Sequence, residues 1–324
     1  MTAPNTRILP YGEAAIAEAA ALIRGGDSVA VPTETVYGLA ADATDAAAVA
    51  QIYAAKGRPS FNPLIVHVLD IDAAERIAVF DDDARALAAA FWPGPLTLVL
   101  PLRAEAGIAS LVTAGLETIA LRVPAHRAMR ALLEAAGVPL AAPSANASGG
   151  ISPTRAAHVV ASLGGRIPLV IDDGATEAGL ESTIVMERGI LRPGPVTAEE
   201  ITRLFPREGG GPDSFSSGLG PRLRGGTEGR IVAPGQLDSH YAPAKPLRLN
   251  ADTADNDEWL IGFGAITGDD TLSATGDLIE AAANLFDALH RADASSRSHI
   301  AVAGVPGEGI GVAINDRLKR AAKR

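Results

Sequence analysis

Helix-like and strand-like patterns alternate along most of this 324-residue chain, and that alternation restricts the possible folds more than any other feature. An alanine-rich amphipathic helix is predicted over residues 13–24, where a pair of glycines ends it, and a strand follows over 28–31. Strands that alternate with helices are typical of a sheet buried under helices. The sequence therefore predicts an α/β fold built on a twisted mixed sheet.

The same patterns predict a large first domain and a smaller second one. Further helices are expected over residues 46–55, 72–78, 83–91, 128–136 and 153–163, and strands over 64–68, 96–100, 118–123, 139–142, 169–172 and 182–186. After Phe205 the chain becomes rich in Gly, Ser and Pro, as linkers are. A shorter α/β unit follows, with strands over 247–249, 259–262 and 300–303 and a helix over 278–290. We expect domains over 1–205 and 246–324, joined by a linker and loop over 206–245.

The composition excludes several classes of function. A net charge of −10 argues against a surface that holds long nucleic acid, because such a surface carries a basic stripe. The chain has no cysteine, which excludes disulfides, thiol catalysis and cysteine metal sites. Residues 1–7 show no secretory signal, and no apolar run approaches the roughly 20 residues that a membrane span needs. We expect a cytoplasmic protein that spans no membrane.

Lysine is rare in this chain, and Lys56 is the only one in its first 244 residues. It opens the segment Lys-Gly-Arg-Pro at 56–59, which a hydrophobic strand soon follows. Because arginine supplies most of the positive charge in this chain, a lysine at this position indicates a specific role. Its ammonium group is a compact, movable charge that is suited to binding phosphate. A solvated charge in a loop is the alternative, and the local glycine and prolines, which fix the backbone, argue against it.

Polar side chains crowd the segment Val-Pro-Thr-Glu-Thr-Val-Tyr-Gly-Leu at 31–39, directly after a predicted strand. Such crowding at a strand end indicates a ligand-binding loop. A capped turn explains the segment equally well, since Thr is a common cap and Gly a common turn residue. From these residues alone, both interpretations stay open.

A second segment, 141–154, runs from an apolar strand through small residues into a predicted helix. Ser152 is predicted as the N-cap and Pro153 as the first helical residue. Small side chains let backbone N–H groups approach an anion, and a helix N-terminus adds partial positive charge, so the segment predicts a phosphate cradle. A nucleophilic Ser144 is the alternative, but it lacks the Gly-x-Ser-x-Gly setting and a recognisable histidine base.

Arg122 and Arg192 each end an apolar strand. Either could simply extend its head group to water, but together with Lys56 and Arg58 they indicate a site for a polyanion. For His67, alone in an apolar strand, a satisfied core residue is the commoner explanation. None of the six histidines has the spacing of a zinc site, and neither a P-loop nor a dinucleotide fingerprint occurs.

Six short motifs follow one another along residues 8–205: Pro-Thr-Glu-Thr-Val-Tyr-Gly-Leu at 32–39, Lys-Gly-Arg-Pro at 56–59 with Asn-Pro-Leu at 62–64, Trp-Pro-Gly-Pro at 92–95, Pro-Ser-Ala-Asn at 143–146, Glu-Ser-Thr at 181–183 and Leu-Arg-Pro-Gly at 191–194. In this order they resemble the YrdC-like threonylcarbamoyl-AMP synthases. The remainder resembles the Rossmann-like C-terminal domain of the long members of that family, with His-Tyr-Ala-Pro at 240–243 in the connecting loop.

The resemblance implies an ATP-dependent reaction. L-threonine and bicarbonate would form a carbamate that attacks the α-phosphate of ATP and gives threonylcarbamoyl-AMP and pyrophosphate. Mg²⁺ is expected with the phosphates, and we identify no protein ligands for it. The product would pass to a separate tRNA-modifying threonylcarbamoyl transferase complex, so this acidic chain needs little direct tRNA binding.

The resemblance also implies two sets of binding residues. L-threonine is expected to contact Thr35, His67, Arg122, Ala142 and Ser182. ATP is expected to contact Lys56, Arg58, Asn62, Thr118, Ser144, Asn146, Ser152, Arg192 and Tyr241. Arg122 would pair with the amino acid's carboxylate, while Lys56 and Arg58 would be the catalytic residues, offsetting charge on the phosphates as pyrophosphate leaves. Catalysis would then rest on positioning and electrostatics, with no protein nucleophile.

The connecting loop departs from the family pattern. Long members usually carry Pro-Gly-Met-Lys-Tyr-Arg-His-Tyr-Ala-Pro, whereas residues 234–241 read Pro-Gly-Gln-Leu-Asp-Ser-His-Tyr. Our hypothesis is weaker ATP retention than in typical members, and equal ATP affinity in a variant with the usual loop would refute it. Two other functions stay open as alternatives: an enzyme that activates a different amine or carbamate in an ATP-dependent reaction, and an RNA-binding module.

Overall fold

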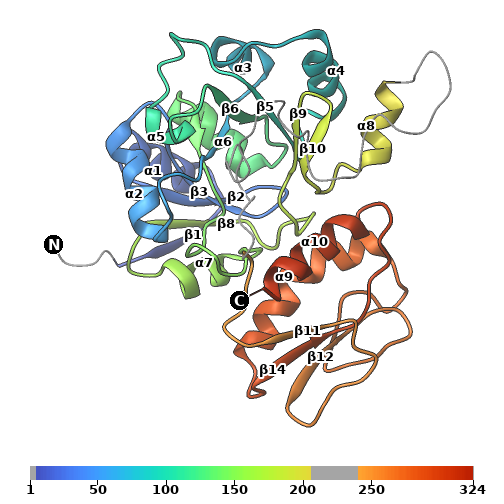
Figure 1. Cartoon of the computed structure of the whole chain (residues 1–324). Helices are drawn as coiled ribbons and strands as arrows, with labels where there is room; N and C mark the ends of the chain where they lie inside the picture. The colour runs from blue at the N-terminus through green and yellow to red at the C-terminus, as the bar shows by residue number, and fades with distance from the viewer. Residues whose placement is uncertain (1–4, 206–239, 324) are drawn as a thin grey trace.

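The structure is a computed structural model that describes residues 5–205 and 240–323, and these form two domains (Figure 1). The first domain contains a ten-stranded mixed sheet with the strand order β1-β8-β2-β3-β7-β4-β6-β5-β9-β10. The second contains a four-stranded sheet in which every pair is parallel. The predicted α/β fold, with a large mixed sheet and a smaller second domain, is confirmed. The predicted linker lies largely in 206–239, outside the described residues.

The elements of the first domain have these bounds. Its strands are β1 (Arg7–Pro10), β2 (Val29–Pro32), β3 (Tyr37–Asp42), β4 (Ile65–His67), β5 (Leu96–Pro101), β6 (Thr118–Arg122), β7 (Leu140–Ala141), β8 (Leu169–Asp172), β9 (Thr183–Met186) and β10 (Gly189–Arg192). Its helices are α1 (Glu13–Arg24), α2 (Ala46–Lys56), α3 (Ile71–Ile77), α4 (Asp82–Phe91), α5 (Ser110–Thr113), α6 (Arg127–Ala136), α7 (Ala156–Leu163) and α8 (Ala198–Leu204).

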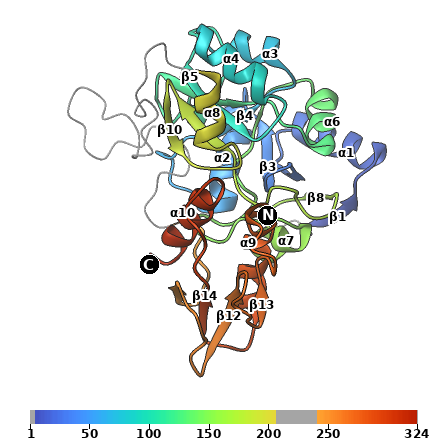
Figure 2. The same cartoon turned by 90° about the vertical axis from the view of Figure 1, so that its right-hand side faces the viewer.

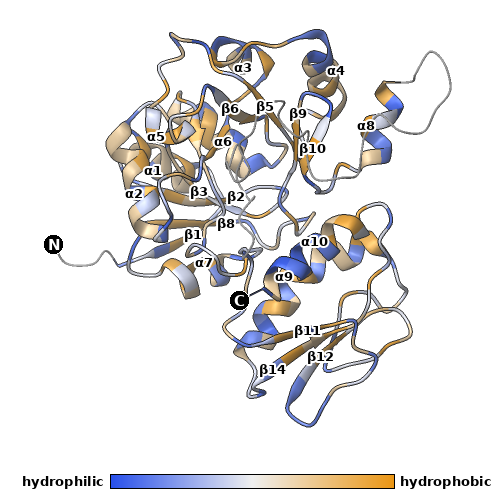
Figure 3. Ribbon diagram, in the orientation of Figure 1, coloured by the Kyte–Doolittle hydropathy of each residue, from blue (hydrophilic) through white to orange (hydrophobic). Residues whose placement is uncertain are grey.

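Helices cover both faces of the large sheet, and each face has its own core. Alternate side chains of β2 and β3 point to opposite faces, as the pleat requires: Val31 and Ala40 pack with α1 and α6, whereas Leu39 and Ala41 pack with α2 and its neighbours. Hydrophobic and hydrophilic stretches lie side by side on the helices (Figure 3), as expected of amphipathic elements. No helix in the described ranges is long and apolar enough to cross a membrane.

The second domain consists of β11 (Leu247–Leu249), β12 (Glu258–Gly262), β13 (Asp270–Thr271), β14 (His299–Val302), α9 (Leu278–Ala294) and α10 (Gly311–Ala321). Both long helices lie on the side of the small sheet that faces the first domain (Figures 1 and 2). One apolar cluster spans the boundary, because Val36, Ile151 and Leu180 of the first domain pack with side chains of α9 and α10. The two domains therefore share a core.

One local prediction is wrong. Helix α7 begins at Ala156, with Arg155 as its N-cap residue, and not at Pro153 with Ser152 as the cap. The hydroxyl of Ser152 instead donates to Glu181, and the carbonyls of Pro153 and Thr154 accept from Tyr37 and Thr176. These bonds hold residues 152–154 in a loop. The helix N-terminus therefore lies beyond the segment 141–154 and does not contribute its partial positive charge there as the predicted phosphate cradle requires.

Candidate active site

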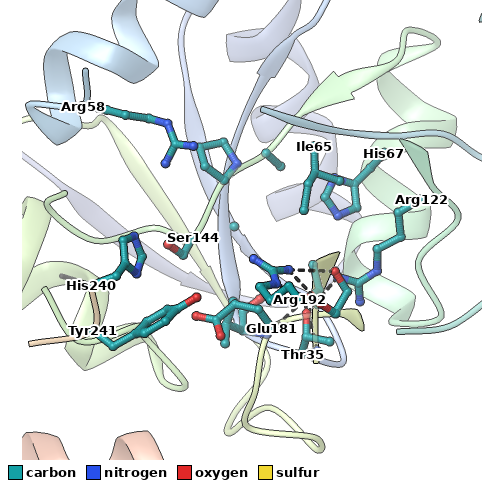
Figure 4. A pocket seen from close by; sticks show the side chains of 16 residues that line it. Thr35, Arg58, Ile65, His67, Arg122, Ser144, Glu181, Arg192, His240 and Tyr241 are labelled. Carbon is teal, nitrogen blue, oxygen red and sulfur yellow. Dashed lines mark hydrogen bonds between the residues drawn. The ribbon is translucent and has the colours of Figure 1, made fainter. Parts of the chain in front are cut away.

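A pocket lies where the β2–β3 turn, strands β4 and β6, the segment after β7, the region of β9 and β10, and residues 240–241 meet (Figure 4). It is lined by Thr33, Thr35, Val36, Gly38, Arg58, Ile65, His67, Arg122, Ala142, Pro143, Ser144, Glu181, Ser182, Arg192, His240 and Tyr241. The space left between these side chains is only about 50 Å³. A water molecule needs about 10–15 Å³ of such space, so the pocket holds a few waters and is far smaller than the roughly 300 Å³ or more of a typical ligand site.

The structure brings together most of the residues that the sequence predicts. The predicted threonine set lines the pocket completely, and four of the predicted ATP residues do so as well: Arg58, Ser144, Arg192 and Tyr241. Lys56, Asn62, Asn146 and Ser152 are buried but are not among the lining residues. Thr118 begins β6, while Arg122 ends it, so the two lie roughly 13 Å apart along the strand.

The β2–β3 turn contributes hydroxyls to the pocket, and it is also a capped turn. The Thr33 hydroxyl donates to the Val36 carbonyl at 2.7 Å and accepts from the N–H groups of Thr35 and Val36. It also lies 2.8 Å from the Thr35 hydroxyl. The two interpretations of this segment are therefore compatible, because the capping bonds fix the hydroxyl that lines the pocket.

Arg122 is buried and is held from three directions. Its Nε donates to the Gly94 carbonyl at 3.2 Å and its Nη1 to the Thr35 hydroxyl at 2.9 Å. Its Nη2 lies 2.6 Å from Glu34 Oε1 as an ion pair, although neither of these two atoms has a well-aligned hydrogen bond. The other oxygen of Glu34 accepts from the N–H groups of Ala125 and His126. A preorganised cation with spare hydrogen-bonding capacity is suited to a carboxylate.

His67 lies beside Arg122 because β4 and β6 pair in parallel with these two residues in register. Both of its ring nitrogens are buried without a hydrogen-bond partner, so it is not the satisfied core histidine that the sequence favoured. Burial, together with the charge of Arg122, lowers the pKa of His67 to about 3. The ring is therefore neutral at ordinary pH and has both a donor and an acceptor to offer.

Arg192, at the end of β10, binds Ser182, the residue directly before β9. Its Nε and Nη2 donate to the Ser182 carbonyl at 3.0 and 2.8 Å, and Nη2 also donates to the Ser182 hydroxyl at 3.1 Å. That hydroxyl lies 2.7 Å from the hydroxyl of Thr97 on β5. The guanidinium and the serine hydroxyl thus line the pocket as one fixed unit.

Lys56 lies beneath the segment that carries Ser144. Its Nζ donates to the carbonyls of Ser144 and Asn146, each at 2.5 Å. Burial, with the charge of Arg58, holds the pKa of Lys56 well below its ordinary value, although Glu181 opposes the effect. The segment is also tied to β3, because Ala145 N–H donates to the Tyr37 carbonyl at 2.7 Å. Lys56 therefore positions the backbone of this segment.

Arg58 lines the pocket from the loop after α2. Its Nε donates to the Asn62 carbonyl at 3.1 Å and its Nη2 to the Pro63 carbonyl at 2.8 Å. The amide side chain of Asn62 is fully buried and has no hydrogen-bond partner. Arg58 therefore presents a cation to the pocket, while the Asn62 amide lies behind the lining residues with its donors and acceptor unpaired.

Two further pocket residues, Glu181 and His240, belong to motifs that the sequence analysis singled out but did not assign to the site. Glu181 precedes β9, and its Oε1 accepts from the Ser152 hydroxyl. His240 packs edge-on against Tyr241 at 4.1 Å, and its Nδ1 has no partner. Figure 4 shows His240 and Tyr241 on one side of the pocket, with His67 and Arg122 on the other.

The pocket is not built as a metal centre. In the described part of the chain, no group of three or more His, Asp or Glu side chains could hold a metal ion. Glu181, the carboxylate among the lining residues, is already paired with an arginine. Mg²⁺ prefers oxygen ligands and keeps several waters, so an ion here would depend mainly on the ligand's phosphates.

Comparisons with known proteins identify the family. Residues 21–194 match a family model described as telomere recombination, and residues 196–323 match one described as the threonylcarbamoyl-AMP synthase C-terminal domain. The chain is 40% identical to the threonylcarbamoyl-AMP synthase of Bacillus subtilis over 95% of its own length and 92% of the relative's. The chain belongs to the threonylcarbamoyl-AMP synthase family.

A comparison with solved structures supports the same family assignment. The crystal structure of Pyrococcus abyssi Sua5 complexed with L-threonine matches it with a TM-score of 0.86 and 36% identity, over 98% of this chain and 97% of the other. In sequence, the threonylcarbamoyl-AMP synthase of that organism is 38% identical over 94% of this chain and 93% of its own. The similarity therefore covers both domains, and the resemblance deduced from the motifs is confirmed.

Proposed function

We propose that this protein synthesises L-threonylcarbamoyl-AMP from L-threonine, bicarbonate and ATP. The threonine amine and bicarbonate form a carbamate with loss of water. A carbamate oxygen then attacks the α-phosphate, and pyrophosphate leaves. Family membership over both domains supports this activity, and the observation that carries it is the pocket, where three arginines meet the hydroxyls of Thr35, Ser144 and Ser182.

We assign the two sides of the pocket to different substrates. On the side of β4 and β6, Arg122 pairs with the threonine carboxylate, and Thr35, His67 and Ser182 surround the amino acid, with Ala142 at its back. The close match to a relative solved with L-threonine supports a threonine site in this fold. A neutral His67 offers one donor and one acceptor to the substrate's polar groups.

We assign the other side to ATP. Arg58 and Arg192 offset the negative charge that gathers on pyrophosphate as it leaves, and Ser144 and Tyr241 contact the nucleotide. Lys56 acts through the backbone that it holds, while Asn62, Asn146 and Ser152 support the same region from behind the lining residues. Mg²⁺ would neutralise phosphate charge. The protein's own residues bind and orient the substrates and exclude water.

The narrow space in the pocket implies that the nucleotide side opens before ATP binds. His240 and Tyr241 directly follow residues 206–239, which lie outside the described residues. That range includes residues 236–239, where the loop differs from the family pattern. Tyr241 has a left-handed backbone, with φ 66°, and its hydroxyl lacks a partner. We expect this pair to move outward and then close over the bound nucleotide.

The cellular role follows from the product. Threonylcarbamoyl-AMP carries an activated acyl group, and we propose that a separate tRNA-modifying threonylcarbamoyl transferase complex consumes it in the cytoplasm. The net charge of −10 fits a protein that releases a small product and does not itself hold tRNA.

Mass spectrometry of the products tests the proposed function. The protein is incubated with ATP, Mg²⁺, bicarbonate and one of L-threonine, L-serine or L-valine, and each is omitted in turn as a control. We expect an adenylate only with bicarbonate present, and strong rejection of valine, because a site that binds a hydroxyl leaves polar groups unpaired without one. Efficient use of valine would favour activation of another amine, and no adenylate at all would refute the proposal.

A further inference from the structure

Arg317 joins the second domain to the candidate active site. It lies on α10 and, with none of its surface exposed, is the largest fully buried side chain in the described residues. Its Nε donates to Glu181 Oε2 at 2.8 Å, and its Nη2 donates to the Glu181 carbonyl at 3.4 Å. A side chain of the C-terminal domain thus binds a carboxylate that lines the pocket of the first domain.

The residues around Arg317 hold its guanidinium group in a fixed orientation. Its Nη1 donates to Asp316 Oδ2 at 2.8 Å, and Asp316 in turn accepts from Arg320 one turn further along α10. Asp316 therefore fixes the guanidinium from the side of its own helix, while Glu181 fixes it from the first domain. An arginine held by two carboxylates has its planar fork oriented before any ligand arrives.

The buried negative charge of Glu181 requires a cation such as Arg317 beside it. Burial raises the pKa of Glu181, but the charges of Arg317 and Arg192 and the hydrogen bond from Ser152 outweigh burial and hold the pKa below its ordinary value. The carboxylate is therefore charged at neutral pH. A bare carboxylate beside a triphosphate would repel it strongly at low dielectric, whereas a paired one repels it little.

A second contact of Arg317 points to the same side of the pocket. Its guanidinium lies over the ring of Tyr241, 5.1 Å from the ring centre. That ring also packs on Phe286 of α9, at 5.6 Å. Arg317 therefore touches Tyr241, which we assign to ATP, and Glu181, which accepts from Ser152 behind the same side of the pocket. Within the described residues, none of its hydrogen bonds or ring contacts involves a residue that we assign to threonine.

We propose that Arg317 is a positioning residue for ATP, through which the C-terminal domain completes the nucleotide side of the active site. It neutralises and orients Glu181 and supports Tyr241. This inference rests on the proposed function, since ATP is the ligand whose binding it serves. It gives the second domain a direct part in substrate binding: a chain without Arg317 keeps its threonine side and loses affinity for ATP.

Calorimetric titration tests the proposal by measuring two dissociation constants, for ATP with Mg²⁺ and for L-threonine. The proteins are the unaltered chain, Arg317→Met, Glu181→Gln and the double variant. We expect Arg317→Met to weaken ATP binding at least tenfold and threonine binding less than threefold. In the Glu181→Gln background the same change should weaken ATP binding by clearly less than tenfold, because the charge that Arg317 offsets is gone and only its support of Tyr241 is lost.

Arg248→Met is the matched control, because Arg248 also forms an Arg–Glu pair from the second domain, but its partner Glu258 does not line the pocket as Glu181 does. It should bind both ligands like the unaltered chain. If Arg317→Met does not fold, the comparison of Glu181→Gln with the double variant decides, since neither leaves a buried carboxylate without its cation. A loss of tenfold or more between those two would contradict the proposal.

The remaining outcomes separate this inference from the proposed function. If the unaltered chain binds neither ATP nor threonine, both the proposed function and the role of Arg317 are overturned. If it binds both and Arg317→Met binds ATP equally well, only the role of Arg317 is overturned. Equal losses for ATP and threonine would indicate a general structural role and would also overturn it.

Discussion

At the scale of single residues, Lys56 shows how a buried charge acts through backbone. Its ammonium group donates to the carbonyls of Ser144 and Asn146, and so sets the course of the segment on the nucleotide side. Arginine is not an equivalent replacement, because its rigid planar fork presents its donors in a geometry different from that of the compact ammonium, which bonds both carbonyls from one atom.

Lys56→Ala is therefore expected to lower the rate of pyrophosphate release at least 100-fold, about 2.7 kcal/mol of transition-state stabilisation. The two carbonyls lose their donor, so the free energy of unfolding should also fall by about 1–3 kcal/mol while unfolding stays cooperative. Coupled pyrophosphate assays and circular dichroism check the two effects.

Lys245→Ala is the control for Lys56→Ala. Lys245 also donates to backbone carbonyls, those of Ala292 and Ser295, but at the end of α9 in the second domain. It should cost stability and leave turnover intact. An active Lys56→Ala enzyme would contradict the positioning role of Lys56.

His67 gives a pH dependence whose sign follows from its burial. The unfolded chain protonates this histidine near pH 6.5, whereas the folded chain keeps it neutral down to about pH 3. Below pH 6.5 the unfolded state binds more protons, so stability falls with falling pH by up to about 1.4 kcal/mol per pH unit from His67. His67→Gln should flatten the slope by that amount.

Urea unfolding between about pH 7 and pH 4.5 measures this slope for the unaltered chain and for His67→Gln. The same substitution at His299, which is exposed at the start of β14, is the control. Identical slopes for His67→Gln and the unaltered chain would show that the folded protein protonates His67 readily.

At the scale of elements, the turn after β10 packs against the start of β9 with no room to spare. A Cβ on Gly194 would lie 2.4 Å from the Thr183 nitrogen and 2.7 Å from the Glu181 carbonyl oxygen. Gly194→Ala should push the two segments apart, cost about 1–3 kcal/mol of stability and weaken ATP binding, because Arg192 would move from Ser182.

Thermal unfolding and ATP titration check the Gly194→Ala variant. Gly12→Ala is its control, since a Cβ at Gly12 meets nothing within 4 Å and the backbone there is extended. Unchanged stability and unchanged ATP affinity in Gly194→Ala would mean that the turn has more freedom than its contacts indicate.

The elements that could be predicted from sequence are those with local signals. The helix Glu13–Arg24 has alanine periodicity and a glycine stop, and its predicted span agrees with the structure, as does that of the strand Leu169–Asp172. Strand β3 was not predicted as a strand, because Tyr-Gly-Leu-Ala-Ala-Asp has few strand-forming residues and depends on pairing with β2 and β7. The wrong start of α7 has a similar cause, since the distant Glu181 takes the Ser152 hydroxyl.

The site residues also fall into two groups, those that local sequence motifs reveal and those that only the fold brings together. Residues within compact motifs, such as Arg58 and Ser182, were predicted as site residues and line the pocket. The pairing of Arg122 with Glu34 joins residues on different elements, and Glu181 meets Arg317 across 136 positions of sequence. Partners so distant leave no local pattern, so only the folded chain shows them.

At the scale of the whole molecule, the two domains are joined by polar as well as apolar contacts. Asp287 of α9 accepts from Arg155 at 3.1 Å and lies 3.3 Å from His158 Nε2. His290 stacks on His158, with ring centres 3.8 Å apart, and its Nε2 lies 3.1 Å from the Ser152 carbonyl. With the shared apolar cluster, these contacts couple the second domain to the loop that carries Ser152.

The domains should therefore unfold together. Differential scanning calorimetry is expected to show one transition, and Asp287→Ala should lower its midpoint by roughly 2–4 °C for each kcal/mol lost. Leu204→Ala, at a partly exposed site on α8, is a control away from the domain boundary. Two resolved transitions in the unaltered chain would contradict a shared core.

The central claim is that a threonine carbamate attacks the α-phosphate of ATP in this pocket. The most direct measurement incubates the protein with ¹³C-bicarbonate, L-threonine, Mg²⁺ and ATP, and follows the label and the phosphorus products by nuclear magnetic resonance. The account predicts equal amounts of pyrophosphate and of an adenylate that carries the label in its carbamoyl carbon. Release of ADP and phosphate, or an adenylate without the label, would contradict it.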